Sequence, residues 1–217
     1  MQRIVKPEIL DQLDPDDPAA LKNRLDLRLF NWLMWNNGWM RRTLTCIVNP
    51  EDSVLELGAG VGDFGLYLHG SQTPPGFGYA GLDRLPRPAQ WPVAWAWHQA
   101  DLVDFHGYAD YTVLCGTFIL HQFDNAVLQK LFQTILPHLR ALIFCETARR
   151  RLHLVQLPLS YLLGINYVSR HDTRVSIEGG FYGQELPELL CLEPDKWMIE
   201  TTMTFLGAYR LVAVRKG

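Results

Sequence analysis

The sequence lacks the usual marks of a secreted, membrane-spanning or metal-binding protein. Its four cysteines lie far apart, and none forms a CxxC pair or a cysteine–histidine group with zinc-ligand spacing. The first residues contain no apolar signal region, and no apolar run reaches the length of a membrane span. These absences predict a reduced, soluble, cytoplasmic protein with no metal ligands and no membrane partner.

Positive charge is also scarce. The 217 residues carry a formal net charge of -3, and only five of them are lysines. The densest basic run, at residues 149–151, is typical of a solvated helix face. A protein that binds nucleic acid through phosphate contacts needs a basic surface, so the composition predicts no nucleic-acid partner.

The chain has enough apolar residues, 48%, to bury the core of one domain. We expect a single domain over 1–217, with a helical cap over 1–50, a ligand-binding core over 51–147, and a substrate region and final hairpin over 148–217. Asp17 followed by Pro18 predicts a helix start, because apolar residues then recur at helical spacing. Asn36-Asn37-Gly38 is expected to break that helix before a second one over 39–48.

From residue 53 onward, strand and helix patterns alternate. Strand-like runs cover 53–57, 79–83, 93–97, 111–116 and 141–145, and helical runs cover 64–69 and 125–136. Such alternation predicts a mainly parallel sheet that binds ligands at the carboxyl ends of its strands. Two final strand-like runs, 198–205 and 208–214, are separated by only two residues, which favours an antiparallel hairpin.

The strongest chemical signal is the stretch from 54 to 63, Val-Leu-Glu-Leu-Gly-Ala-Gly-Val-Gly-Asp. A strand that runs into glycines lets a ligand approach the backbone closely, since glycine has no Cβ. The dinucleotide fingerprint GxGxxG would require glycine at position 63, where this sequence has Asp63. The spacing here is GxGxG.

Four motifs, in the right order, resemble those of class I S-adenosylmethionine (SAM) dependent methyltransferases of the small-molecule branch. They are the glycine loop 56–62, the acid that ends Gly81-Leu82-Asp83, the pair Asp101-Leu102, and the segment 115–121, Cys-Gly-Thr-Phe-Ile-Leu-His. The resemblance covers about two-thirds of the chain. It implies an α/β, Rossmann-like, doubly wound sheet of seven strands, mainly parallel with an antiparallel C-terminal hairpin, under an N-terminal helical cap.

The resemblance also implies roles for residues around the cofactor. Asp83 would bind both ribose hydroxyls, Asp101 the adenine amino group, and the Leu102 amide the adenine ring. Glu56 would orient the loop or the cofactor's ammonium group. The remaining residues expected at the cofactor are Gly58, Ala59, Gly60, Asp63, Arg84, Gly116 and Thr117.

Methyl transfer from a sulfonium is an in-line displacement that requires alignment and water exclusion, so no triad or metal is expected. His121 follows the fourth strand and is either a general base or a hydrogen-bonding part of the cleft wall. Arg149 is a candidate substrate ligand. His171, a weaker candidate for the base, and Asp172 form either a substrate contact or a surface turn. Trp32 either caps the cleft or packs in the core.

These motifs predict transfer of a methyl group from SAM to a small molecule, aromatic or quinone-like, by a monomer or homodimer. One alternative is a nucleotide-dependent oxidoreductase, and another is a SAM-binding module without catalysis. Methylation of nucleic acid or protein is a weaker alternative, because the fourth-strand motif lacks an Asn/Asp-Pro-Pro-Tyr pattern.

Overall fold

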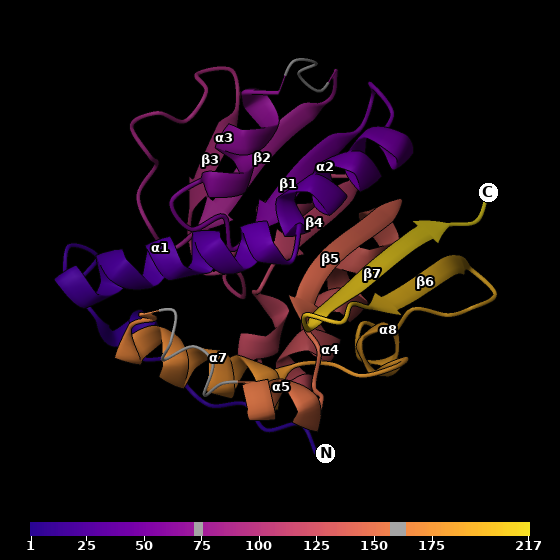
Figure 1. Ribbon diagram of the computed structural model, residues 1–217. Helices are drawn as coiled ribbons and strands as arrows, with labels where there is room; N and C mark the ends of the chain where they lie inside the picture. The colour runs from indigo at the N-terminus through magenta and orange to yellow at the C-terminus, as the bar shows by residue number, and fades with distance from the viewer. Residues whose placement is uncertain (72–75, 157–163) are drawn as a thin grey trace.

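A computed structural model describes residues 1–71, 76–156 and 164–217 and contains one seven-stranded sheet (Figure 1). The strand order is β3-β2-β1-β4-β5-β7-β6. The first five strands run parallel, and β7 pairs antiparallel with both β5 and β6. The predicted α/β fold with an antiparallel C-terminal hairpin is therefore confirmed. The strands are β1 (Ser53–Leu57), β2 (Gly78–Asp83), β3 (Ala96–Gln99), β4 (Val113–Thr117), β5 (Ala141–Thr147), β6 (Trp197–Met203) and β7 (Ala208–Arg215).

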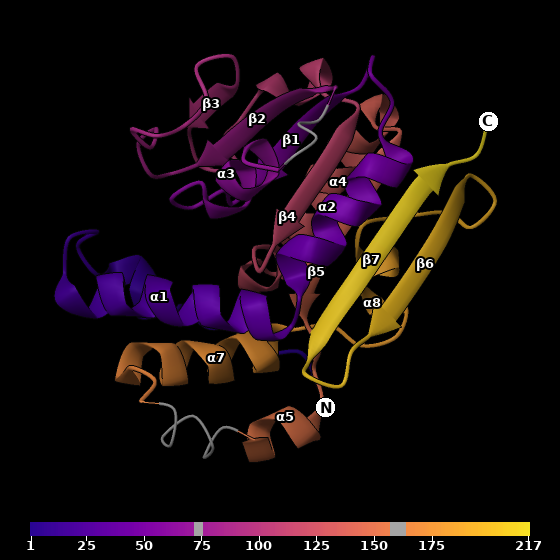
Figure 2. The same ribbon diagram turned by 45° about the horizontal axis from the view of Figure 1, so that its top comes forward.

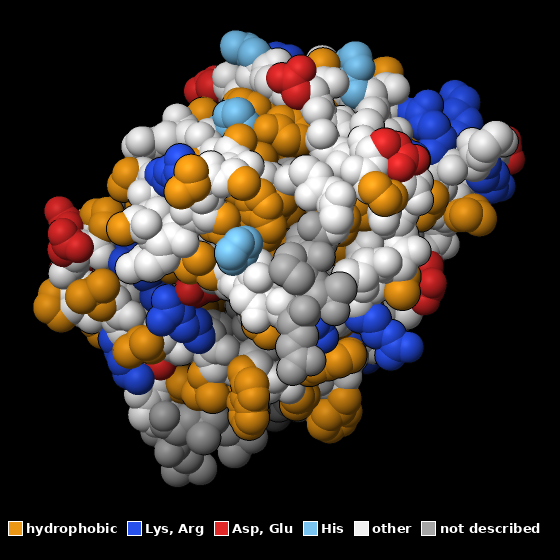
Figure 3. Space-filling view, turned by 90° about the horizontal axis from the view of Figure 1, so that it is seen from above, with side chains coloured by type: hydrophobic (Ala, Val, Ile, Leu, Met, Phe, Trp, Pro, Cys, Tyr) orange, Lys and Arg blue, Asp and Glu red, His pale blue; other side chains and the backbone are white. Residues whose placement is uncertain are grey.

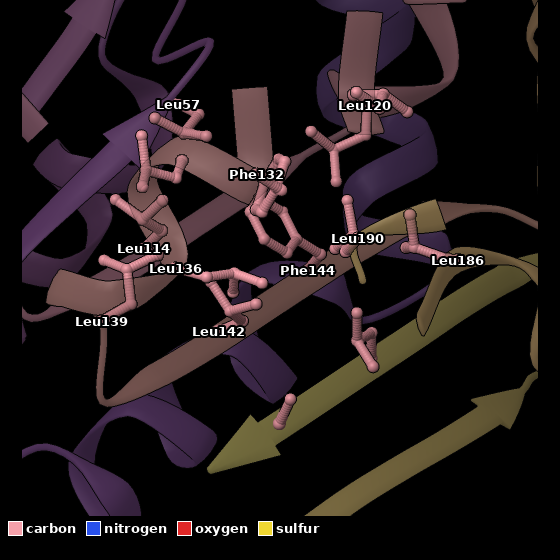
Figure 4. Close-up of a cluster of buried hydrophobic side chains, with 14 of the residues drawn as sticks. Leu57, Leu114, Leu120, Phe132, Leu136, Leu139, Leu142, Phe144, Leu186 and Leu190 are labelled. Carbon is pink, nitrogen blue, oxygen red and sulfur yellow. The ribbon is translucent and has the colours of Figure 1, made fainter. Parts of the chain in front are cut away.

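Helices cover both faces of the sheet because successive residues of each buried strand point to opposite sides. Val54 packs with α2 (Asn36–Ile47) and α3 (Asp63–His69) on one face. Its neighbour Leu55 belongs to the core on the other face, with α4 (Asn125–Ile135) and α8 (Glu185–Leu189). In that second core Phe132 of α4 meets Phe144 of β5 edge-on, with ring centroids 6.3 Å apart (Figure 4).

Two helices, α1 (Pro18–Leu33) and α7 (Tyr167–Gly179), lie side by side beyond the carboxyl ends of the parallel strands (Figures 1 and 2). The short helix α5 (Arg151–Gln156) follows β5 on the same side. Asp17 caps α1 as expected, accepting a 2.7 Å hydrogen bond from the amide of Ala19. The buried carboxylate of Asp26 joins the two long helices, because it accepts hydrogen bonds from the Asn166 amide at 2.9 Å and the Ser169 hydroxyl at 2.7 Å.

The predicted break between the first two helices is displaced. Asn36-Asn37-Gly38 forms the first turn of α2, and the chain turns instead at Trp35, whose φ is 55°. The buried Asn36 amide donates to the Asn31 side chain at 3.0 Å. Gly38 is needed because a Cβ there would lie 2.3 Å from the Trp35 indole nitrogen. These residues usually stop a helix, but here tertiary contacts place them inside one.

The third strand is also shorter than predicted. It begins at Ala96, and Val93 is 94% exposed outside the sheet. Trp95 is buried, but it packs in an aromatic cluster with Tyr79 at 4.6 Å and Trp91 at 5.8 Å between ring centroids. The alternation of apolar residues at 93, 95 and 97 therefore does not mark a single strand. Trp97 lies in β3, whereas Trp95 is apolar because it packs in the aromatic cluster.

The surface and helices of the described chain give two further findings. Within the described ranges, no helix has both the length and the apolar character to cross a bilayer. On the face shown in Figure 3, Lys and Arg side chains lie in separate small groups with Asp and Glu among them.

Candidate functional site

A cavity of about 1020 Å³ opens at the carboxyl ends of β1, β2 and β4. One end, the loop end, is formed by the glycine loop and the residues that follow β2 and β3. The other end, the helix end, is formed by α1, α7, the β6–β7 link and an N-terminal segment, residues 3–13, that we call the strap. Ligands of open α/β sheets bind at this edge, so the cavity is the candidate site.

The glycine loop exposes its backbone to the cavity. Gly58, Gly60 and Gly62 all have positive φ, at 64°, 59° and 82°. A Cβ added at Gly60 would meet no atom within 4 Å, whereas one at Gly58 would lie 2.6 Å from the Ile119 side chain. Gly58 therefore permits the turn to pack, and Gly60 leaves open space for a ligand beside the backbone.

Asp83 closes the loop end at the carboxyl end of β2. Its two carboxylate oxygens accept hydrogen bonds from the amides of Gly60 at 2.7 Å and Leu85 at 2.9 Å. Each oxygen keeps a second lone pair, which can accept a ligand hydroxyl. Burial raises the pKa of Asp83, although hydrogen bonds from these amides oppose that effect. Asp101 and Leu102 line the same end of the cavity as Asp83.

Glu56 lies beneath the glycine loop and is 4% exposed. The Tyr79 hydroxyl donates to its carboxylate at 2.8 Å. Burial raises the pKa of Glu56 to about 8, since that hydrogen bond does not offset the loss of solvent. A cation bound in the cavity beside Glu56 would restore its charge.

The remaining residues expected at the cofactor do not all line the cavity. Gly116 does not line the cavity among the described residues; a Cβ there would lie 2.9 Å from the Leu57 carbonyl, so it allows β4 to pack against β1. Ala59 and Thr117 do line the cavity, and so do two rim residues, Asp63 and Arg84. Asp63 pairs with Arg28 of α1 at 2.7 Å, and Arg84 pairs with Asp11 of the strap at 2.8 Å. Both ion pairs connect the loop end to the helix end.

His121 lies in the cavity wall with 3% of its surface exposed. Its Nδ1 is 2.8 Å from a Glu146 oxygen, and its Nε2 is 3.1 Å from a Glu8 oxygen. Burial would lower the pKa of His121, but the hydrogen bonds to Glu146 and Glu8 outweigh burial and raise it to about 10. In this arrangement both ring nitrogens lie at hydrogen-bond distance from carboxylates, which favours the protonated ring and leaves neither nitrogen open to a substrate proton.

The acceptor-side predictions have mixed positions. Asp172 lines the cavity on α7, not in a surface turn, and accepts hydrogen bonds from the amides of Ile9 and Leu10 at 2.8 and 3.1 Å. His171 lies beside it, half exposed and outside the described cavity lining. Two other candidates, Arg149 and Trp32, are likewise not among the described lining residues. Arg149 is buried in an ion pair with Glu185, so it is no solvated helix face, and Trp32 is 74% exposed on α1.

The helix end is mainly apolar, with a few buried polar groups. Asn23 of α1 is 1% exposed, and its Oδ1 has no hydrogen-bond partner among the described residues. No group of three potential metal ligands occurs in the described part of the chain. The apolar side chains that line this end are Leu10, Leu13, Leu27, Phe30, Leu33, Met34, Ile177, Phe205 and Leu206.

Sequence patterns missed Glu8, Glu146 and Asn23 as parts of the site. Glu146 ends a strand beside the fourth-strand motif, and that position at the ligand edge was the available signal. Glu8 lies 113 residues from His121 in the chain, and no local motif marks it.

No family model matches this chain, and no curated protein does. Solved structures do resemble it. The plantazolicin methyltransferase BpumL in complex with SAH has a TM-score of 0.68 at 13% identity, over 93% of this chain and 92% of that one. The pyocyanin biosynthetic protein PhzM has a TM-score of 0.58 at 14% identity, over 97% and 62%.

Human N-acetylserotonin methyltransferase in complex with SAM has a TM-score of 0.60 at 13% identity, over 95% of this chain and 61% of that one. At identities this low, the likeness to these structures shows the fold alone. The strand pairing described above agrees with that result. In that order of seven strands, β7 is next to last and runs antiparallel to its neighbours. This chain therefore has the Rossmann-like fold of these methyltransferases.

Proposed function

We propose that this protein is an enzyme that transfers a methyl group from SAM to a small, apolar molecule with an aromatic or quinone-like ring. The observation that carries the proposal is the loop end of the cavity. There Asp83 accepts a hydrogen bond from the Gly60 amide and lines the cavity together with Asp101 and Leu102. The likeness to methyltransferases crystallised with SAM or SAH supports it.

The residues of the loop end suit the parts of SAM. Asp83 would accept hydrogen bonds from the ribose hydroxyls, and Asp101 and the Leu102 amide would hold the adenine ring. Glu56 would become ionised beside the ammonium group. Bound SAM supplies an electrophilic methyl group on a sulfonium. Thr117 at the end of β4 would form the floor of the reacting region, while α1, α7 and the strap exclude water.

The helix end suits an apolar acceptor. Its side chains are mostly aliphatic or aromatic, and a ring buried there gains the free energy of removing apolar surface from water. The unpartnered Oδ1 of Asn23 would accept one hydrogen bond from the acceptor. A donor group on one edge of an otherwise apolar ring meets both requirements.

Calorimetric titration with SAM, SAH and NAD tests the cofactor. We expect binding of SAM and SAH but not NAD; binding of NAD alone would favour the oxidoreductase alternative. Turnover of a panel of phenols, hydroquinones and related aromatic acceptors then tests catalysis. Tight SAM binding with no turnover across the panel would favour a non-catalytic module.

Asp83→Ala tests the ribose role. The substitution removes charge-assisted hydrogen bonds to the ribose, so SAM affinity should fall by about 2–3 kcal/mol, measured by calorimetry. Asp104→Ala is the matched control, because Asp104 is an exposed carboxylate in the next loop and does not line the cavity. Equal affinity of the Asp83 variant and the wild type would refute the assignment.

A further inference from the structure

Three hydrogen-bond donors converge on the carboxylate of Glu8. One Glu8 oxygen lies 3.1 Å from His121 Nε2 and accepts from the Ser176 hydroxyl at 2.6 Å. The other accepts from the Gln122 side-chain amide at 3.0 Å. Glu8 lines the cavity and is 8% exposed. A charged residue of the strap thus forms part of the wall of the helix end.

The strap is anchored independently of Glu8. Arg3 donates to the carbonyls of Gly179, His121 and Phe123 at 2.7, 3.2 and 2.9 Å, and its guanidinium lies 4.7 Å from the Phe181 ring centroid. Further along the strap, the amides of residues 9 and 10 bind Asp172. The Glu8 side chain can therefore leave His121 by rotation while the strap backbone stays bound.

The two neighbours of His121 differ in their freedom to move. Glu146 is fully buried, and its second oxygen accepts from the amides of Ile119 at 3.0 Å and Leu120 at 2.7 Å. Glu146 therefore fixes the ring through Nδ1, and Nε2 is left to Glu8, which lines the cavity. Glu8 from the strap is the group that covers Nε2.

The charged groups that contact His121 come from two segments, and a third, α7, reaches it through Glu8. Glu146 of β5 and Glu8 of the strap contact the ring, and Arg3 contacts its backbone carbonyl. From α7, the Ser176 hydroxyl lies within hydrogen-bond distance of Glu8, at 2.6 Å, and of the backbone carbonyl of Asp172, at 2.7 Å, and its one proton is shared between these two acceptors. Glu8 is the one of these charged groups that both contacts the ring and lines the cavity, among the described residues.

We propose that Glu8 is a positioning residue that keeps His121 protonated in the resting protein, and that an acidic hydroxyl of the acceptor takes the place of Glu8 at Nε2. This rests on the proposed function. When Glu8 rotates away as a carboxylate, the Nε2 proton passes to water, while the Nδ1 proton stays on the ring and remains hydrogen-bonded to Glu146. The freed Nε2 lone pair then takes the acceptor's hydroxyl proton. The oxygen electron pair forms the bond to the methyl carbon, and the methyl–sulfur bonding pair stays on sulfur.

The first test is the titration of His121 by NMR in the resting protein, without cofactor or acceptor. The ring signals are assigned by their loss in His121→Gln. Glu8→Gln keeps the shape of the side chain but removes its charge, so the His121 titration midpoint should fall by about one pH unit or more. Lys6→Ala is the matched control, because Lys6 is an exposed strap residue paired with Glu178. The His121 titration midpoint in Lys6→Ala should equal that of the wild type.

An unchanged midpoint in folded Glu8→Gln would overturn the proposal. If that variant does not fold, Glu8→Asp serves instead, because it keeps the charge but withdraws the carboxylate by one methylene. It should lower the midpoint by a smaller amount, and an unchanged midpoint there is equally contradictory. Neither result depends on methyl transfer, so this test is separate from that of the proposed function.

The second test is the pH dependence of kcat/KM, which reports ionisations of the free enzyme, with an acceptor found in the panel. In the wild type, the rate should rise with pH as the ring loses its proton. In Glu8→Gln this rise should move to lower pH and keep its plateau. A rate that falls equally at every pH, with the rise unmoved, would show a merely structural role and refute the displacement step. Absence of turnover in wild type and all variants would instead refute the proposed function.

Discussion

The carboxyl group of Glu56 is buried beneath a loop that we expect to receive a cation. Its pKa of about 8 means that most of the resting protein carries this acid protonated near pH 7. A cationic ammonium nearby favours the carboxylate, so the pKa of Glu56 must fall on binding. SAM binding should therefore release up to about one proton per site between pH 6 and 8.

Calorimetry of SAM binding in two buffers with different ionisation enthalpies measures this proton. The apparent enthalpy of binding should differ between the buffers for the wild type and much less for Glu56→Gln, which has no proton to release. Proton uptake by the wild type, or equal release by both proteins, would contradict the proposed position of the ammonium group.

At the scale of residues, sequence predicted those groups that lie within a local motif. Asp83, Asp101 and the glycine loop follow strands, and the carboxyl ends of parallel strands meet at one edge. Trp32 and Arg149 show the limit of this reasoning. The helical spacing of Trp32 did not tell which side of α1 faces the cavity, and the position of Arg149 after β5 did not reveal its partner Glu185.

Among the elements, α1 and α7 are joined by the buried carboxylate of Asp26. Burial would raise the pKa of Asp26, but hydrogen bonds from Ser169, Asn166 and Lys22 lower it. Asp26→Ala removes these bonds and leaves the Ser169 hydroxyl and the Asn166 amide without their acceptor. We expect the free energy of unfolding to fall by about 2–4 kcal/mol, measured by urea denaturation.

Lys22→Ala is the control for this prediction. Lys22 pairs with Asp26 at 3.0 Å, but its side chain is half exposed, so its loss should cost less than about 1 kcal/mol. Equal losses in the two variants would mean that the Asp26 contacts to α7 contribute little.

The boundaries of elements were predictable where a single cause set the pattern. The strands β1, β4 and β5 are apolar because they are buried between two layers of helices, and the sequence predicted all three. Two causes overlapped elsewhere. The aromatic residues before β3 belong to a cluster of rings. At the start of α2, Asn36 makes a buried hydrogen bond to Asn31, and Gly38 leaves room for the Trp35 indole.

For the whole molecule, the pKa shifts define a pH window of stability. Hydrogen bonds outweigh burial and lower the pKa values of Asp52, Asp26 and Glu8 in the folded state. Their contribution to stability is present above their ordinary pKa values and is lost as pH falls through the lowered ones. His121 has the opposite sign: its contribution is full below about pH 6.5 and is lost as pH rises through about 10.

Asp52 offers a test of the acid side of this window away from the cavity. It accepts hydrogen bonds from the Thr112 hydroxyl at 2.8 Å and the Asn49 amide at 2.7 Å, and it pairs with Arg140. Asp52→Asn should lower stability by about 1–3 kcal/mol at pH 7 and make the loss of stability toward pH 3 shallower. Urea unfolding across this range measures both effects. The exposed neighbour variant, Glu51→Gln, should keep the wild-type curve, and an equally steep acid loss in Asp52→Asn would contradict the assignment.

The mainly parallel seven-stranded sheet was predictable because four motifs follow successive strands, and the final hairpin because so short a link favours an antiparallel pair. The closure of the helix end was not, since it depends on contacts between the strap and α7. Those contacts join Arg3 with Gly179, and Glu8 with Ser176, across 176 and 168 residues of chain.

This long separation has a consequence for protein synthesis. The strap is translated well before its partners on α7, which lie 176 and 168 residues further along the chain. At elongation rates of about 5–20 residues per second, residues 3–10 wait roughly 10–30 seconds for a surface to bind. The loop end, whose residues all lie between 56 and 117, can assemble meanwhile. The nascent chain can thus form the loop end before α7 and the β6–β7 link, which complete the helix end, have been translated.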